Sequence, residues 1–303
     1  MNNKNISGHL SAILTIIIWG TTFISTKVLL ADFKPVEILF FRFVLGTLAL
    51  FAVNPHRLKW TTYKQEFTFA ATGLCGICLY YLLENIALTY TTASNVGIII
   101  SSAPFFTAIL TFLFVKEEKP GINFFIGFAA ALTGIFLVSF NGSELKLNII
   151  GDLLALFAAL VWACYSVLTK KLGSYGYNNI LVTRRVFFYG ILFMIPALFL
   201  LDFDFKFNRF ADPVCLFNII YLGLGASALC FVTWNFAVKA LGAIKTSVYI
   251  YMVPVVTTVT SVIILHEKIS ALSVIGIILT LAGSILSEIK IPTRKEDKHG
   301  FKK

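Results

Sequence analysis

The chain has 303 residues, of which 58% are hydrophobic and 13% charged, and its formal net charge is +10. A soluble domain carries about a quarter charged residues, so a water-soluble fold would have too little polar surface to cover this apolar content. The composition therefore excludes an ordinary soluble protein and predicts an all-α polytopic membrane protein.

Ten apolar segments follow one another along the chain. Each is long enough for a helix that crosses a hydrocarbon core of about 30 Å with modest tilt. Backbone polar groups in lipid must be satisfied within their own segment, so these segments are predicted to be transmembrane helices. In chain order they cover residues 10–30, 36–53, 67–89, 93–115, 122–140, 152–170, 180–200, 213–238, 246–265 and 270–288.

The second half of the chain repeats the first. A shift of 143 positions aligns the first two segments of each half, and a shift of 150 aligns the third and fourth. Each half has five segments, so the second copy must enter the bilayer in the opposite orientation, as in secondary transporters. We therefore predict two inverted five-helix repeats, 8–141 and 150–289, and a basic tail, 290–303. The matched pairs include Trp19 with Trp162, Arg42 with Arg185, Asn85 with Asn235 and Pro104 with Pro254.

The distribution of positive charge predicts the orientation. Most of the 25 lysines and arginines fall in loops on the side of the N-terminus or in the tail. Cytoplasmic loops carry such an excess, so both termini are predicted to be cytoplasmic in a plasma or inner membrane. This bias accounts for the net charge. We therefore expect membrane lipid, and not nucleic acid, as the partner of the basic residues.

Several stretches resemble one transporter family. The run E-N-I-A-L-T-Y-T-T-A-S-N-V-G, which begins at Glu84, resembles the most characteristic stretch of the EamA-type drug/metabolite transporters. W-G-T-T-F at Trp19–Phe23 and F-F-R-F at Phe40–Phe43 resemble their first two helices. W-N-F-A-V-K-A-L-G-A at Trp234–Ala243 and P-V-V-T-T-V-T-S at Pro254–Ser261 resemble the second copy. The resemblance implies ten helices in two opposed repeats, a central cavity and, often, export of amino acids or related metabolites.

Polar groups within membrane spans are costly and usually face a partner or a wet pathway, so they are the candidate site residues. Glu84 is the carboxylate that lies deepest in any span, and its matched position is Trp234. It is expected to bind a substrate amine or to exchange a proton; alternatively, it anchors a helix end at the headgroups. The full set expected to line the cavity is Trp19, Tyr81, Glu84, Asn85, Trp162, Tyr165, Trp234, Asn235 and Tyr251.

These residues also have structural interpretations. The aromatic side chains can simply pack in the core, and the matched Asn85 and Asn235 can hydrogen-bond between helices. Arg42 and Arg185 are possible charge partners of a buried carboxylate or a substrate, or they extend to headgroups. Pro104 and Pro254 each remove a helical hydrogen bond and are expected to kink their spans, either as hinges or as static features.

The predicted function is a secondary carrier that moves small organic metabolites by alternating access, with amino acids or related compounds as the expected substrates. Export is the expected direction. The alternatives are a membrane-integral receptor or structural protein and an intramembrane enzyme. An enzyme would require paired aspartates, an H-E-x-x-H motif or a Ser/His arrangement within spans. The histidines (His9, His56, His266 and His299) all lie at or beyond span ends. No cofactor, metal or nucleotide site is expected.

Overall fold

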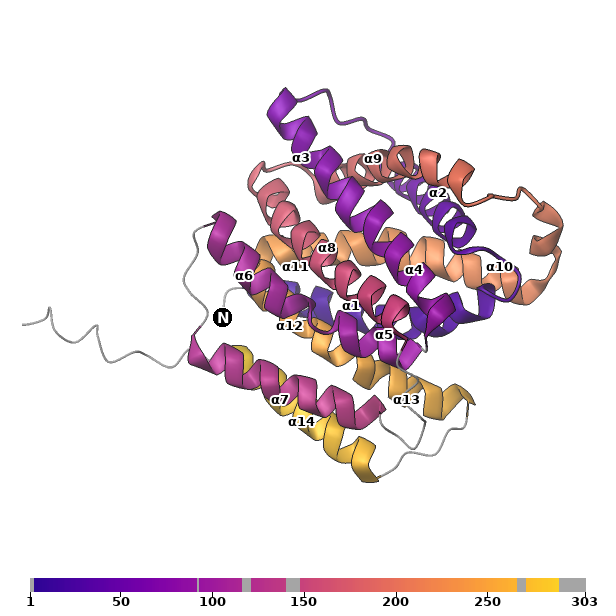
Figure 1. Ribbon diagram of the computed structural model, residues 1–303. Coiled ribbons are helices and arrows are strands. Elements are labelled where there is room, and N and C mark those ends of the chain that lie inside the picture. Colours follow the sequence, from indigo (N-terminus) through magenta and orange to yellow (C-terminus); the bar gives the residue numbers. More distant parts are fainter. Residues whose placement is uncertain (1–2, 92, 116–120, 140–147, 266–270, 289–303) are drawn as a thin grey trace, which may run out of the picture.

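The computed structural model describes residues 3–91, 93–115, 121–139, 148–265 and 271–288, and the tail predicted at 290–303 lies outside these ranges. The described residues are almost entirely helical and contain no β-strand. Their helices group into ten spans (Figure 1). Among them, 6 are long and apolar enough to cross a membrane, and shorter apolar helices make up the others. The all-α polytopic architecture predicted from composition is therefore confirmed.

The first half contains five of these spans. The third is interrupted by a π-helical segment, η1, and the fourth by a turn at Ser101 and Ser102. The elements are α1 (Asn3–Leu29), α2 (Pro35–Val53), α3 (Tyr63–Gly73), η1 (Leu74–Leu79), α4 (Tyr80–Tyr90), α5 (Ala93–Ile100), α6 (Ala103–Val115) and α7 (Ile122–Ser139).

The second half contains the other five. Its third span carries a π-helical segment, η3, and its fourth a 3₁₀ segment, η4. The elements are α8 (Ile149–Ser174), α9 (Asn179–Leu200), η2 (Phe207–Ala211), α10 (Pro213–Ile220), η3 (Tyr221–Leu229), α11 (Cys230–Leu241), α12 (Ala243–Val248), η4 (Tyr249–Met252), α13 (Val253–Leu265) and α14 (Ala271–Glu288).

The predicted spans agree with these helices apart from their ends. Side-chain caps at the span boundaries explain some of the differences, because a polar side chain satisfies an amide that the first turn leaves free. Thr62 accepts a hydrogen bond from the backbone N–H of Gln65, so the third span begins at Tyr63 and not at residue 67. Asn148 likewise caps α8 by accepting a hydrogen bond from the backbone N–H of Gly151. Helix α8 therefore begins at Ile149, three residues before the predicted start at residue 152.

The fourth span of each half departs from α-helical geometry just before its proline. Proline lacks an N–H and clashes with the carbonyl four residues earlier. Pro104 follows the turn at Ser101 and Ser102, and Pro254 follows η4. The Ser101 hydroxyl donates to the carbonyl of Gly97 at 2.7 Å, which helps to satisfy the backbone there. Both spans are thus broken at matched positions.

The two halves pack against each other in matched pairs of helices. Helix α1 packs on α11 and α4 packs on α8, while η3 lies against α2 and η1 against α9. Glycines permit the closest approaches: a Cβ on Gly73 would lie 2.6 Å from the carbonyl oxygen of Val186. The core therefore lies between the halves and not within each one.

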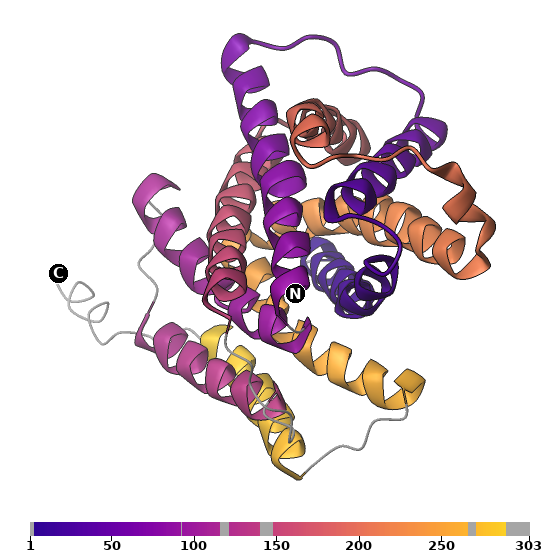
Figure 2. The ribbon, with the colours of Figure 1, turned by 45° about the vertical axis from the view of Figure 1, so that its right-hand side comes forward.

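Helices α7 and α14 form a separate pair that runs along one edge of the molecule (Figure 2). Gly127 approaches Gly283, and Gly134 approaches Gly276; a Cβ on either Gly127 or Gly134 would lie 2.5 Å from the carbonyl oxygen of its partner glycine. The spacing of seven residues brings both contacts onto one face of the helix. Only glycine fits at these positions, as in other small-residue contacts between membrane helices.

Candidate functional site

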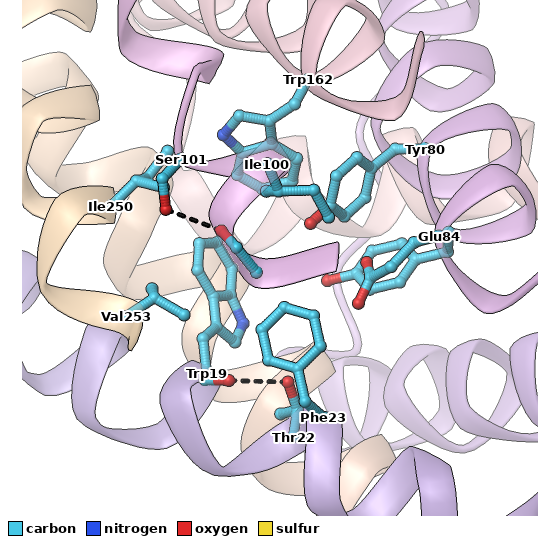
Figure 3. A pocket seen from close by; sticks show the side chains of 12 residues that line it. Trp19, Thr22, Phe23, Tyr80, Glu84, Ile100, Ser101, Trp162, Ile250 and Val253 are labelled. Atoms are coloured by element: carbon cyan, nitrogen blue, oxygen red, sulfur yellow. Dashed lines mark hydrogen bonds between the residues drawn. The ribbon is translucent and has the colours of Figure 1, made fainter. Parts of the chain in front are cut away.

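One pocket lies between the two halves, in the part of the helix bundle nearer the C-terminal end of α1 (Figure 3). Its empty volume is about 490 Å³, including the part open to the outside. The described residues that line it come from α1, α4, α5, α8 and the η4–α13 junction. They are Trp19, Thr22, Phe23, Tyr80, Tyr81, Glu84, Gly97, Ile100, Ser101, Trp162, Ile250 and Val253.

Aromatic rings form most of the wall. The matched Trp19 and Trp162 meet edge to face with their centroids 5.2 Å apart. Tyr80 packs on Trp162 at 4.7 Å and on Tyr81 at 4.8 Å. Contacts of this geometry stabilise a packed cluster beyond the burial of its area. The wall is therefore a fixed aromatic surface.

The two matched tryptophans differ in their hydrogen bonding. The indole N–H of Trp19 donates to the carbonyl of Ala226 in η3 at 2.9 Å. The indole N–H of Trp162 is buried and has no hydrogen-bond partner among the described residues. A buried donor without a partner is costly, so Trp162 is available to a polar group that enters the pocket.

Glu84 supplies the negative charge in the wall. It is 5% exposed, and its Oε2 atom has no hydrogen-bond partner. The Tyr80 hydroxyl hydrogen-bonds to the carboxylate, and the positive charge of Arg42 attracts the carboxylate electrostatically. Figure 3 shows the Glu84 side chain entering from one side, with the indole nitrogen of Trp162 on the opposite side.

Arg42 is not among the residues that line the pocket. Its Nε donates to the Ser227 hydroxyl at 3.0 Å, and its guanidinium lies 4.4 Å from the centroid of the Tyr81 ring. The arginine is 1% exposed and one of its terminal nitrogens has no partner. It is therefore a buried charge held behind the Tyr81 ring.

Of the nine residues expected to line a cavity, the structure brings Trp19, Tyr81, Glu84 and Trp162 to this pocket. The others lie elsewhere in the buried interior, as described next.

Two of the others form an interhelical network. The Tyr165 hydroxyl donates to Asn235 Oδ1 at 2.6 Å, and Asn235 Nδ2 donates to the Thr183 hydroxyl at 2.9 Å. Asn85 Nδ2 donates to the carbonyl of Pro35 at 3.2 Å. The amide side chains therefore join helices rather than face the pocket.

Trp234 and Tyr251 are fully buried. The Trp234 ring packs on Trp19 at 5.1 Å, whereas Tyr251 lies against Phe128 of α7. The indole N–H of Trp234 and the hydroxyl of Tyr251 have no hydrogen-bond partner.

Arg185 lies at the other end of the bundle from the pocket. Its guanidinium pairs with Glu66 at 3.3 Å and donates to the carbonyl of Leu58 at 2.5 Å. Glu66 is 4% exposed and also accepts from the Tyr189 hydroxyl at 2.6 Å. The matched arginines thus have different surroundings, and Arg185 fastens the 54–62 loop of the first half to α9 of the second.

An equivalent fastening holds the 201–212 loop of the second half. Arg209 donates to Glu37 of α2 at 2.7 Å and to the carbonyl of Asp32 at 2.8 Å, and its guanidinium lies 4.2 Å from the Phe33 ring centroid. Glu37 is fully buried. On the same loop, a hydrogen bond from Lys206 lowers the pKa of the exposed Asp204.

Several lining residues were not expected from the sequence. Thr22 and Phe23 lie within a turn of Trp19, which was expected, so helical periodicity on its own could have indicated them. Gly97, Ile100, Ser101, Ile250 and Val253 all flank the two breaks before the prolines. They carry no charge that would single them out, and the broken helices bring them to the pocket.

Comparisons with known proteins give the family. The sequence profile described as the EamA-like transporter family matches residues 6–140 and again residues 149–288. The chain belongs to the EamA-like transporter family. The resemblance noted in the sequence is thereby confirmed, and this transporter is a multi-pass membrane protein.

Similar proteins carry transporter names. An uncharacterized transporter of Archaeoglobus fulgidus is 30% identical, over 96% of this chain and 99% of its own. A probable terminal-alkyne amino-acid exporter of Streptantibioticus cattleyicolor is 26% identical, over 90% of this chain and 91% of its own. A solved crystal structure, 18% identical, matches with a TM-score of 0.76 over 93% of this chain and 96% of that chain, and it supports the fold alone.

Proposed function

We propose that this EamA-like transporter is a secondary carrier, not an enzyme, that exports small organic metabolites, amino acids or related compounds among them, by alternating access. The observation that carries the proposal is the pocket between the two halves, which holds an unpartnered buried carboxylate beside the two broken helices. Concave, largely apolar sites with a few convergent polar groups are typical of small-molecule binding. The amino-acid exporter of Streptantibioticus cattleyicolor supports the substrate class.

The proposal includes the inverted repeat, with units 8–141 and 150–289, and cytoplasmic termini. The reciprocal packing of α1 on α11 and α4 on α8 supports a two-fold relation between the halves. The matched π segments and the matched breaks support it further. Placement of the N-terminal side and the 290–303 tail in the cytoplasm follows the positive charge of those loops.

Topology can be tested by labelling. A single cysteine at Lys206, whose side chain is 67% exposed, should react with a membrane-impermeant thiol reagent from outside the cell only. One placed at Lys298 should react from the cytoplasm only. Both sites reacting from the same side would contradict the ten-span inverted topology.

Alternating access is supported by a difference between matched positions. Four pocket residues of the first half are matched in the second by fully buried aromatic residues: Tyr165 stands at the position of Thr22, Phe231 at Tyr81, Trp234 at Glu84 and Tyr251 at Ser101. One copy of the site is therefore open while its counterpart is filled. In the proposed cycle, α5–α6 and α12–α13 bend at the breaks before Pro104 and Pro254 and open the opposite side.

Within this proposal the expected residues take separate roles. Trp19, Tyr81, Glu84 and Trp162 contact substrate, with Glu84 binding a substrate amine or carrying a coupling proton. Asn85, Tyr165, Trp234, Asn235 and Tyr251 act when the opposite side opens. Arg42 serves as the charge partner of Glu84, and Arg185 as that of Glu66.

The function is tested by counterflow into proteoliposomes loaded with unlabelled amino acids, with one labelled amino acid outside at a time. We expect accumulation of at least one compound, dependent on the protein and abolished in Glu84→Ala. Protein-free liposomes are the control. If no labelled compound accumulates above that control across the amino acids and their amines, the carrier proposal fails.

A further inference from the structure

The wall of the pocket carries a negative charge and no positive charge among its described residues. Among the described residues that line it, Glu84 is acidic and none is a lysine or arginine. This inference rests on the pocket being the ligand site of the proposed carrier. We propose that the pocket recognises its ligand by a cationic amine bound at Glu84, and that it has no site for a ligand carboxylate.

The surroundings of Glu84 suit an ammonium ion. The Oε2 atom is buried without a partner, which leaves a desolvated acceptor facing the pocket. Burying a carboxylate is costly unless it is paired, so an ammonium ion in contact with it offsets part of that cost. The rings of Tyr80 and Trp162 lie beside it with their centroids 4.7 Å apart and their planes tilted by 50°, and aromatic π faces attract cations.

Among the described residues, Arg42 is the cation whose charge acts on Glu84, and its guanidinium lies behind the Tyr81 ring, outside the pocket. Its Nε is engaged by Ser227. Arg42 therefore compensates the buried negative charge from behind the wall and is out of reach of the ligand. A ligand carboxylate would enter an acidic pocket with no cation to receive it.

The other polar groups of the lining residues are neutral, and the Trp162 indole is an unpartnered donor among them. The unpartnered indole N–H of Trp162 faces away from Glu84 in Figure 3. It can donate to a hydroxyl, carbonyl or amide oxygen at the far end of a ligand. The preferred ligand is thus an organic amine with an apolar or aromatic body and a neutral acceptor, and an amino amide or amino alcohol satisfies both contacts as well as an amino acid does.

Four related compounds test whether the pocket binds an amine, a carboxylate or both. 2-Phenylethylamine carries the amine alone, and 3-phenylpropionate carries the carboxylate alone. Phenylalaninamide carries an amine and a neutral acceptor, and phenylalanine carries both charges. Their affinities are measured by isothermal titration calorimetry on the full chain in lipid nanodiscs. We expect phenylalaninamide to bind at least as tightly as phenylalanine, and 3-phenylpropionate to bind at least tenfold more weakly than 2-phenylethylamine.

Variants assign the contacts. Glu84→Gln should lower the affinity for 2-phenylethylamine at least tenfold, and its affinity for 3-phenylpropionate should not fall. Glu84→Asp keeps the charge and should therefore retain the preference for amines. Trp162→Phe should lower the affinity for phenylalaninamide and leave the affinity for 2-phenylethylamine unchanged. Fluorescence-detected size-exclusion chromatography confirms that each variant folds.

The inference would be overturned if none of the four compounds bound. Three further results would also overturn it. The first is binding of 3-phenylpropionate as tight as that of 2-phenylethylamine. The second is unchanged amine affinity in Glu84→Gln. The third is a loss of phenylalanine but not 2-phenylethylamine affinity in Arg42→Gln, which would place a carboxylate at Arg42. Binding is measured without transport, so failure here is distinguishable from failure of the carrier proposal.

Discussion

Gly97 offers a direct test of the pocket. It lies in α5 at the pocket wall, and a Cβ built on it meets no atom of the described residues within 4 Å apart from its chain neighbours and the backbone of its own helix. Gly76, on η1 nearby, is the contrast, because its Cβ would lie 2.0 Å from Cδ2 of Tyr165. A side chain at Gly97 should therefore enter the pocket without disturbing the packing, whereas one at Gly76 must displace a fully buried ring.

The magnitudes follow from these distances. Glycine within a helix costs about 0.8–1.0 kcal/mol relative to alanine, so Gly97→Ala should raise stability or leave it unchanged. Gly76→Ala should lower it by about 1–3 kcal/mol, the usual cost of overpacking. The four carbons of leucine in Gly97→Leu would project into the pocket and should obstruct a substrate there.

The assay pairs thermal unfolding in nanodiscs with initial rates of counterflow. Gly97→Leu should unfold at or above the wild-type temperature and transport at least tenfold more slowly, whereas Gly97→Ala should keep most of its activity. Wild-type transport by a well-folded Gly97→Leu protein would show that substrate does not occupy this pocket. A loss of stability like that of Gly76→Ala would show that the space around Gly97 is not open.

The remaining predictions concern stability and motion. Arg209→Ala leaves the fully buried Glu37 without its cation, so it should lower the free energy of unfolding by about 3–5 kcal/mol. The double variant Arg209→Met with Glu37→Gln removes both charges and should lose less stability in the same thermal unfolding assay. Equal losses of stability in the two proteins would contradict a charge effect. Gly134→Leu should separate α7 from α14, because its Cβ position is 2.5 Å from a backbone oxygen, and a folded protein of unchanged stability would be the opposing result. Pro104→Ala and Pro254→Ala should each change initial transport rates at normal expression, and a double variant with normal rates would reduce both prolines to packing.

The number and order of the membrane helices could be predicted from the sequence because hydrocarbon imposes its demand on each segment separately. A run of apolar residues must satisfy its own backbone, so composition and length decide the outcome locally. The breaks in the fourth span of each half were foreseeable for the same reason, since Pro104 and Pro254 remove hydrogen bonds wherever they occur in a helix. The π segments η1 and η3 carry no such signal, and only the structure revealed them.

The candidate site was predicted in part. Glu84 and the matched tryptophans stood out because a carboxylate is costly in a membrane and because the repeat aligned Trp19 with Trp162. The repeat gave matched residues equal weight, whereas the structure places them in different surroundings. Asn85 and Asn235 join helices, Tyr165 and Trp234 are packed within the core, and none of them lines the pocket.

By itself, then, the sequence determined a polytopic helical transporter with a repeated plan, because hydropathy, charge bias and family motifs are properties of the chain alone. Only the tertiary structure decided which of the matched residues meet at the pocket. Thr22 and Ser101 line the pocket whereas their counterparts Tyr165 and Tyr251 are buried elsewhere, and Arg42 lies behind the Tyr81 ring, outside the pocket that Glu84 lines. These outcomes depend on which side chains from distant helices meet, and no local pattern records such contacts.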